Sequence, residues 1–282
     1  SVTSTITLND PLPAECESTV GSLQYAGYDL TSLNNSVYSG SGSTVYTWYE
    51  SDMITAVVGP TNILLNNGDQ YYLEVVDGNC SNTIMITFAV NPSPSMNSVA
   101  ALELCDDGTG QATFDLTAEE TNINGTGPTY NWFSDAGLTT PITTPGTYTS
   151  GSGSAYLEVT DANGCSNSIN LDLTVNPLPT ANSTSTDVCD DGTGQATFDL
   201  TSLETTVDGG AGNAINWFSD AGLTTPIATP GSLTTASTTV YAEVTDATTG
   251  CVNSTSVNLN ITAAPAAPVL SNNASYLSLI HI

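Results

Sequence analysis

The sequence predicts an all-β protein made of tandem repeats, and three observations lead to that prediction. A run of thirteen residues, CDDGTGQATFDLT, occurs at 105–117 and returns letter for letter at 189–201. Stretches in which apolar and polar residues alternate strictly recur once per repeat, as half-buried strands do. No long stretch has the 3.6-residue period of an amphipathic helix. Identity of this length indicates a duplicated structural unit, so function has to be sought in the repeat.

The cysteines mark the limits of the repeats. Three of them open successive units, Cys16, Cys105 and Cys189, and three close them, Cys80, Cys165 and Cys251. The predicted repeats span 11–94, 95–179 and 180–268. Residues 1–10 resemble the end of a repeat and are expected to form the last strand of a preceding one. Residues 269–282 are expected to be the truncated start of a next unit, with an artefactual tail at 277–282 (LSLIHI) that matches a reading frame of a sequencing-adapter end.

Each repeat is expected to close with a hairpin. In the last strand of the second repeat, Leu171 and Leu173 face one way while Asn170 and Asp172 face the other, which is the period of a half-buried strand. The preceding strand, AYLEVTD, leads through a short turn with Asn and Gly into Cys165, as in a β-hairpin. A central strand of each repeat carries a tryptophan that we expect in the core: Trp48, Trp132 and Trp217.

The charge balance excludes some partners. The chain has 28 acidic residues and no Lys or Arg, for a formal net charge of −28. Without a fixed cation it should repel nucleic acid and anionic lipid, so no nucleic-acid partner is expected. Hydrophobic residues make up 39% of the chain, which is too many for a charge-driven disordered protein. No apolar run reaches transmembrane length, so no membrane insertion of this sequence is expected.

One pair of cysteines per repeat predicts three disulfides in an oxidising compartment. The predicted pairs are Cys16–Cys80, Cys105–Cys165 and Cys189–Cys251. Zinc is the rival interpretation, but the sequence has no CxxC pair and its single histidine is His281. Each predicted bond would tie the start of a repeat to the hairpin before its last strand. It would stabilise that repeat by roughly 4 kcal/mol in the chain-entropy model.

The residues required for most catalytic mechanisms are missing. Nucleophilic catalysis has no histidine base, and no Lys or Arg can serve as acid or oxyanion donor. Carboxylates remain, and a glutamate recurs in the strand before each closing cysteine: Glu74, Glu158 and Glu243. These glutamates alternate with apolar residues and should face solvent singly, whereas a glycosidase needs two carboxylates across one cleft. We therefore expect no enzyme activity and no cofactor other than calcium.

Calcium is considered because the opening stretch offers the hard oxygen ligands that it prefers. The candidate ligands recur in the second and third repeats: Asp106, Asp107, Thr109 and Asp115, then Asp190, Asp191, Thr193 and Asp199. Their spacing does not match an EF-hand loop. The alternative is a Gly-rich turn whose aspartates cap local N–H groups, and both interpretations stay open at the level of sequence.

One aromatic residue per repeat is a candidate ligand contact. Tyr49, Phe133 and Phe218 follow the tryptophans directly and so point to the opposite face of the strand. If that face is exposed, these rings could stack on a sugar or a partner protein. The alternative is that they cover a neighbouring loop or the edge of a second sheet.

The order Cys, FDLT, Trp, Tyr-x-Glu-Val-Thr-Asp, Cys, alternating strand, Asn-Pro-x-Pro resembles the Ig-like repeats of large secreted surface proteins of Bacteroidetes. These are gliding-motility-associated, type IX-secreted, adhesin-like proteins. The resemblance covers 1–268 and is most specific in CDDGTGQATFDLT and YLEVTDANGC. It implies tandem Ig-like β-sandwich domains with one disulfide each, display outside the cell and no catalytic residues. One departure is the 27 residues between Cys105 and Trp132, because antibody-type domains place the tryptophan soon after the first cysteine.

The expected function is therefore that of a non-catalytic extracellular repeat region of an adhesin-like cell-surface protein. It would act as a spacer and offer a multivalent adhesion surface. The alternative is a carbohydrate-binding module array of a secreted enzyme. The expected partners are an extracellular glycan or protein surface and the neighbouring repeats of the same chain.

Overall fold

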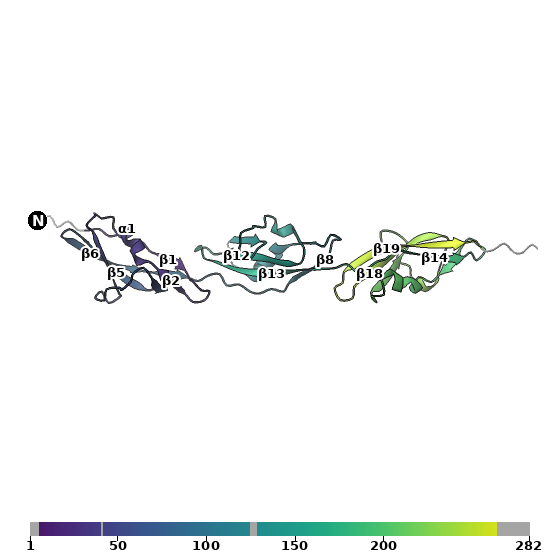
Figure 1. Ribbon diagram of the computed structural model, residues 1–282, viewed down its shortest axis with the longest axis horizontal. Coiled ribbons are helices and arrows are strands. Elements are labelled where there is room, and N and C mark those ends of the chain that lie inside the picture. Colours follow the sequence, from purple (N-terminus) through teal and green to yellow (C-terminus); the bar gives the residue numbers. More distant parts are fainter. Residues whose placement is uncertain (1–5, 41, 125–128, 264–282) are drawn as a thin grey trace, which may run out of the picture. The chain divides into compact units, whose positions relative to one another are not determined.

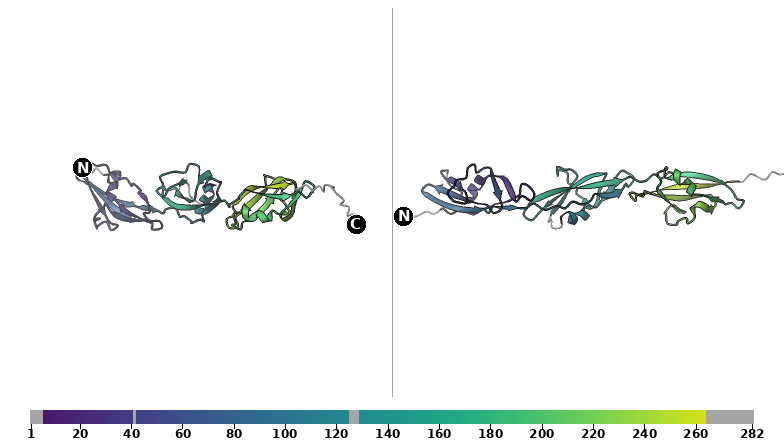
Figure 2. Two further views of the ribbon diagram at one scale, coloured as in Figure 1. Left: turned by 45° about the vertical axis from the view of Figure 1, so that its right-hand side comes forward. Right: turned by 90° about the horizontal axis from the view of Figure 1, so that it is seen from below.

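The computed structural model describes residues 6–40, 42–124 and 129–263 (Figure 1). Strands dominate this part of the chain, and its helical segments are short (Figures 1 and 2). The chain divides into two compact units, Ser1–Leu104 with Gln111–Thr174, and Cys105–Gly110 with Val175–Ile282. The predicted all-β class is confirmed, whereas the expectations for residues 1–5 and 269–282 lie outside the described residues.

Within its described residues, the first repeat has seven strands in three sheets. The opening strand β1 (Ala14–Cys16) pairs in parallel with β7 (Ala89–Asn91). A second sheet pairs β2 (Gln24–Tyr28) with β4 (Ile63–Asn66). The third has the order β3 (Val45–Tyr49), β5 (Gln70–Asp77) and β6 (Cys80–Thr87). The faces between these sheets bury one core that includes Leu30, Trp48, Leu73, Ile86 and Phe88.

The second and third repeats share one topology. In the second, a four-stranded sheet has the order β10 (Thr129–Phe133), β12 (Gly153–Thr160), β13 (Ser166–Asn176) and β8 (Leu102–Cys105), and β9 (Ala112–Phe114) pairs with β11 (Tyr148–Ser150). In the third, the order is β16 (Ala214–Phe218), β18 (Thr238–Thr245), β19 (Val252–Thr262) and β14 (Thr184–Cys189), and β15 (Ala196–Phe198) pairs with β17 (Leu233–Thr235). The opening strand β14 runs parallel to the closing strand β19, with Cys189 opposite Thr262. A repeat therefore begins and ends on neighbouring strands.

The closing hairpin forms as predicted. Strands β12 and β13 pair antiparallel from Gly153 opposite Leu173 to Thr160 opposite Ser166. Leu171 and Leu173 are buried, and Asn170 and Asp172 are exposed. The tryptophans are also core residues, between 2% and 4% exposed. Each indole N–H donates to a side chain of the short helix that precedes the tryptophan strand: Trp48 to Asn34, Trp132 to Glu120 and Trp217 to Glu204.

The sequence FDLT folds as a corner between a strand and a helical turn. Phe114 ends β9, and Leu116 begins the 3₁₀ turn η2 (Leu116–Glu119), which continues into α2 (Glu120–Ile123). Asp115 between them caps the turn, its Oδ1 accepting from the N–H of Thr117 at 3.1 Å and from the Thr117 hydroxyl at 2.6 Å. Such a cap satisfies an N–H that has no partner within the helix. The motif is thus a structural corner with two buried apolar side chains.

Residues 6–9 join the first repeat, contrary to the expectation that 1–10 would belong to a preceding one. Ile6 is buried, and Leu8 packs against the core of the first repeat. The N–H of Asn9 donates to the carbonyl of Val37 at 3.0 Å. The N–H groups of Asn97 and Asn182 make the same bond to the ends of the equivalent helices, at 2.9 and 2.7 Å. These residues are therefore the first segment of a repeat, in the structural place of the residues that follow Pro94 and Pro179.

Candidate functional site: the disulfide junctions

The two disulfides connect different repeats. Cys16 is bonded to Cys165 with 5.4 Å between their Cα atoms, and Cys105 to Cys251 with 5.5 Å. The first bond lies within one compact unit and the second within the other. In each, the opening cysteine of one repeat meets the closing cysteine of the next. The predicted pairs Cys16–Cys80, Cys105–Cys165 and Cys189–Cys251 are therefore wrong.

Strand direction explains this correction. In the third repeat, Cys251 directly precedes β19, and Cys189 lies opposite Thr262 at the far end of the same strand. At about 3.3 Å per residue, this 11-residue strand separates the two cysteines by roughly 30 Å. A disulfide needs Cα atoms within about 7 Å. Because the opening and closing strands run parallel, the two cysteines of a repeat cannot bond to each other.

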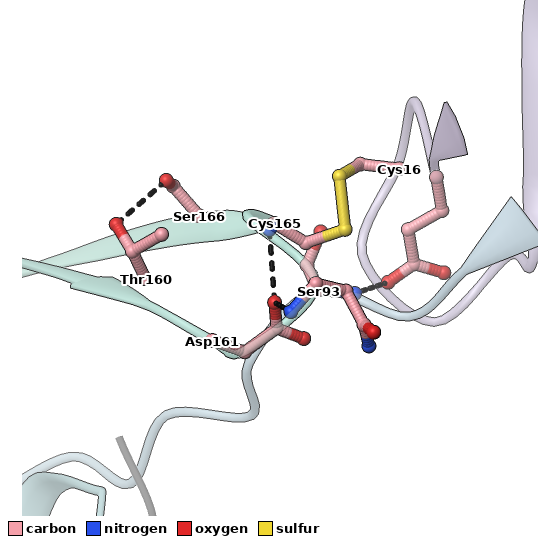
Figure 3. The surroundings of a disulfide bond; sticks show 8 residues. Cys16, Ser93, Thr160, Asp161, Cys165 and Ser166 are labelled. Carbon is pink, nitrogen blue, oxygen red and sulfur yellow. Dashed lines mark hydrogen bonds between the residues drawn. A yellow bond between two sulfur atoms is a disulfide. The ribbon is translucent and has the colours of Figure 1, made fainter. Parts of the chain in front are cut away.

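The first junction is built around the turn of the second repeat's hairpin (Figure 3). Asp161 shapes this turn, because its Oδ1 accepts from the N–H groups of Asn163 and Cys165, both at 2.9 Å. The hydroxyls of Thr160 and Ser166 meet across the hairpin at 3.0 Å. The turn thus holds Cys165, which is fully buried, at a fixed place facing Cys16.

Glu17 fixes the other side of this junction. Its carboxylate accepts from the N–H of Leu23 at 2.8 Å, of Gly21 at 2.8 Å and of Ser93 at 2.9 Å. These bonds, that of Leu23 foremost, hold the pKa of Glu17 below its usual value. The residue after Cys16 is thereby attached to Ser93, just before the chain enters the second repeat. Backbone N–H groups stabilise the charge in a chain that has no Lys or Arg.

Replacing Glu17 by glutamine should lower the thermal unfolding midpoint at neutral pH. A lowered folded-state pKa gives stability that is present above the unfolded-state pKa of about 4.3 and is lost as pH falls through the folded-state value. The gap between wild type and Glu17→Gln should therefore close as the pH is lowered below about 4. Thermal unfolding followed by circular dichroism at neutral and acid pH measures this difference in midpoint between wild type and Glu17→Gln. Glu15→Gln, two positions earlier on β1, is the matched control, and an equal pH profile for both variants would contradict the assignment.

The second junction has the same arrangement as the first, with one extra residue in its hairpin turn. Asp246 shapes the longer turn, its Oδ1 accepting from the N–H groups of Thr248 at 2.8 Å and Thr249 at 3.0 Å. These backbone bonds, with that of Thr249 first, lower the pKa of Asp246. The N–H of Cys251 donates to the Thr249 hydroxyl at 3.3 Å, and Cys251 is fully buried. The insertion relative to the second repeat is absorbed in the turn, and the cysteine keeps its place.

An asparagine two positions after each closing cysteine clamps the incoming chain, a role that was not predicted from the sequence. The side-chain amide nitrogens donate to backbone carbonyls at 2.8 to 2.9 Å: Asn82 to Ile6, Asn167 to Pro94 and Asn253 to Pro179. The recurrence of Cys-x-Asn in all three repeats is the sequence signal that would have found it. These clamps hold the segment that enters each repeat against the start of the strand that follows the closing cysteine.

Cys189 occupies the opening position of the third repeat. It is exposed, and among the described residues it takes part in no disulfide. Its backbone repeats the arrangement at Cys16: the N–H of Asp190 donates to Thr262 at 2.9 Å, as that of Glu17 donates to Asn91 at 3.0 Å. The third repeat therefore presents a thiol with the backbone setting of a junction cysteine.

The calcium candidates fold as two separate groups in each repeat. Asp106 accepts from the N–H groups of Gly108 and Gly110 at 2.7 and 2.8 Å, and Asp107 from the N–H and hydroxyl of Thr109 at 2.9 and 2.6 Å. Asp190, Asp191 and Thr193 make the same turn, and bonds from Thr193, its hydroxyl first, lower the pKa of Asp191.

The remaining two candidates lie at the start of helical turns: Asp115 caps η2, and Asp199 accepts from the N–H of Thr201 at 3.0 Å. Among the residues that the structure describes, no three His, Cys, Asp or Glu gather as a metal site. This geometry supports the turn interpretation, and calcium binding stays a prediction.

The aromatic candidates lie half-buried on the outer face of the sheet. Tyr49, Phe133 and Phe218 each stand opposite a tyrosine of the neighbouring strand, Tyr72, Tyr156 and Tyr241 respectively. Each also bridges to the loop that folds back after the tryptophan strand, at Ala56, Pro141 and Pro226. In the first repeat the Tyr49 hydroxyl donates to Glu74 at 3.0 Å, which raises the pKa of Tyr49. These two residues, with Met53, Ile54, Tyr72 and Thr83, line a pocket of about 370 Å³.

No helix within the described ranges is long and apolar enough to cross a membrane. Comparison with protein families gives one match, described as Flavobacterium inter-domain disulphide bond domain, at residues 101–179 and 185–265. Among curated proteins, none matches the sequence.

The solved structures that match include three multi-domain proteins. An I-band fragment of titin is 9% identical, with 90% of this chain and 97% of that chain covered and a TM-score of 0.35. The insect immune protein hemolin is 10% identical, with 90% and 76% covered and a TM-score of 0.27. Extracellular domains 3–5 of Drosophila OTK are 12% identical, with 92% and 98% covered and a TM-score of 0.24. The predicted class of tandem Ig-like β-sandwich domains is confirmed by the sheets of the repeats and by the repeated family match, with disulfides that connect repeats instead of lying one within each.

Proposed function

This chain belongs to the Flavobacterium inter-domain disulphide bond domain family, and on that premise we propose that it is a section of a cell-surface array whose successive repeats are joined by disulfides, an arrangement here called lacing. The array serves as a spacer that carries an adhesive region away from the cell. The observation that carries the proposal is the bond between Cys16 and Cys165, which joins the opening of one repeat to the closing hairpin of the next.

The proposed units are the repeats 11–94, 95–179 and 180–268, with residues 6–10 added to the first. Cys105–Cys251 makes the same link one repeat further on. By the same scheme, the exposed Cys189 would form a disulfide with the closing cysteine of a further repeat. One sulfur of each described link is fully buried, and buried disulfides are kept from thiols in solution. Disulfides of this kind persist in an oxidising environment such as the space outside the cell.

The remaining parts of the proposal rest on composition and resemblance. A chain with 28 acidic residues and no cation stays soluble and avoids nucleic acid and anionic lipid. The resemblance to gliding-motility-associated surface proteins supports export by the type IX route. No catalytic role is proposed for any residue.

Disulfide mapping tests the proposed lacing. Trypsin has no site in this chain, so the unreduced protein is cut at Asp and Glu and the linked peptides are identified by mass spectrometry. We expect peptides that link Cys16 to Cys165 and Cys105 to Cys251, and alkylation of Cys189 before reduction. A sample reduced before digestion is the control. Recovery of Cys16–Cys80 or Cys105–Cys165 would contradict the proposal.

A carbohydrate-binding array is the second candidate, and the outer aromatic pairs favour it. In each repeat two aromatic residues lie opposite each other on neighbouring strands, and the first repeat adds a pocket with a carboxylate and a threonine that suits a neutral sugar. A glycan-array screen of the whole chain distinguishes the candidates. Selective binding that is lost in Tyr49→Ala and kept in Val45→Ala, an exposed change on the same strand, would favour sugar binding over a pure spacer.

A further inference from the structure

The two disulfides close overlapping loops. The first spans 149 positions and the second 146. Cys105 lies inside the first loop, and Cys165 lies inside the second. The segment 105–165, which is 60 positions long (165 minus 105), therefore belongs to both loops.

This overlap shortens the covalent path along the molecule. From Cys16 the shortest route crosses the first disulfide to Cys165, runs backwards along the chain to Cys105 and crosses the second disulfide to Cys251. It contains 60 positions of backbone, whereas the chain from Cys16 to Cys251 contains 235 (251 minus 16). The segments 17–104 and 166–250 are longer parallel branches, and a branch of greater length stays slack when the shortest route is taut.

We propose that the overlapping bonds give the chain a further function, that of a load-bearing tether of bounded length. At full extension, tension along the chain is carried by the backbone of 105–165 and by the two disulfides. The main parts of the first and third repeats lie on the slack branches. This inference rests on the proposed function, because an array between a cell and a surface transmits tension.

The tether limits extension even when every repeat unfolds. At 3.3 to 3.6 Å per residue, 60 extended positions reach about 20 nm and 235 reach about 80 nm. The branches 17–104 and 166–250 join the same two points as 105–165, so the first repeat, with its core of Leu30, Trp48 and Phe88, must also open before the route reaches its full length. Overload therefore lengthens the array only up to this covalent limit.

Single-molecule pulling on the whole chain, with handles at its two ends, measures this length. For the oxidised protein we expect the segment between Cys16 and Cys251 to reach about 20 nm, and for the reduced protein about 80 nm. Cys16→Ser leaves the route through 16–105 and the second bond, 89 positions (105 minus 16), and Cys105→Ser leaves 86 (251 minus 165). Both should reach about 30 nm. Cys189→Ser is the matched control and should equal the wild type.

The outcomes separate the tether from the lacing on which it rests. If mapping of the resting protein returns the two inter-repeat bonds and the oxidised chain still extends as far as the reduced one, the bonds break under load. The tether is then wrong and the lacing stands. If the bonds lie within repeats, the lacing itself is wrong, and Cys189→Ser would lengthen the chain by 62 positions (251 minus 189). Adding reductant to the stretched wild type gives the length change without any variant, so a variant that fails to form its remaining bond does not decide the result.

Discussion

Replacing Cys16 by serine is expected to lower the free energy of unfolding of the unit that contains it by about 2–5 kcal/mol, the usual cost of losing a native disulfide. The bond closes a loop of 149 positions, and long loops gain most from closure in the chain-entropy model. The variant also leaves the thiol of Cys165 buried without its bond. Urea unfolding of the oxidised protein, followed by tryptophan fluorescence, measures the loss.

Cys189→Ser is the control for this experiment. Cys189 is exposed, and a surface change of this kind usually alters stability by less than about 0.5 kcal/mol. Reductant should bring wild type and Cys16→Ser to the same unfolding curve. Equal losses from Cys16→Ser and Cys189→Ser in the oxidised protein would contradict the assigned pairing.

The second large effect is expected in the core of the third repeat. Phe198 is 1% exposed and packs with Leu200, Trp217 and Val240 in one cluster. Phe198→Ala removes most of that side chain and leaves a cavity, at a cost of about 3–5 kcal/mol. In thermal unfolding of the oxidised chain, the transition of the third repeat should occur at a lower temperature in Phe198→Ala than in the wild type.

Thr197→Ala, on the exposed face of the same short strand, provides the comparison. It should leave the unfolding midpoint nearly unchanged, because its hydroxyl contacts Thr234 at the surface. If Thr197→Ala destabilised the protein as much as Phe198→Ala, the inward and outward faces assigned to β15 would be wrong.

The elements that sequence alone predicted are those with a local pattern. Strict alternation places Leu171 and Leu173 inside and Asp172 outside because successive side chains of a strand point to opposite faces. The aspartates of the repeated opening stretch bond to groups two to four residues away, so the turn interpretation needed only neighbouring residues. The calcium interpretation needed distant ligands to meet, and spacing along the chain does not contain that information.

The disulfide pairing was missed because it depends on strand direction. One cysteine pair per repeat suggests bonds within repeats, but parallel pairing of β1 with β7 and of β14 with β19 puts the cysteines of one repeat at opposite ends of the closing strand. An alternating pattern shows that a strand exists without showing which strand lies beside it or in which direction. The entry segment 6–9 was misplaced for the same reason, since its contacts with Val37 and Asn82 lie far along the chain.

The asparagine clamps have a consequence for the medium in which the protein works. A chain of net charge −28 repels itself, and this repulsion changes with salt because dissolved ions screen it over about 10 Å at 0.1 M. Asn82, Asn167 and Asn253 hold backbone carbonyls through neutral amides, and neutral hydrogen bonds depend little on ionic strength. Added salt should therefore weaken the repulsion between segments and leave the clamps intact. Such a protein would hold together better in brackish or marine water than in fresh water.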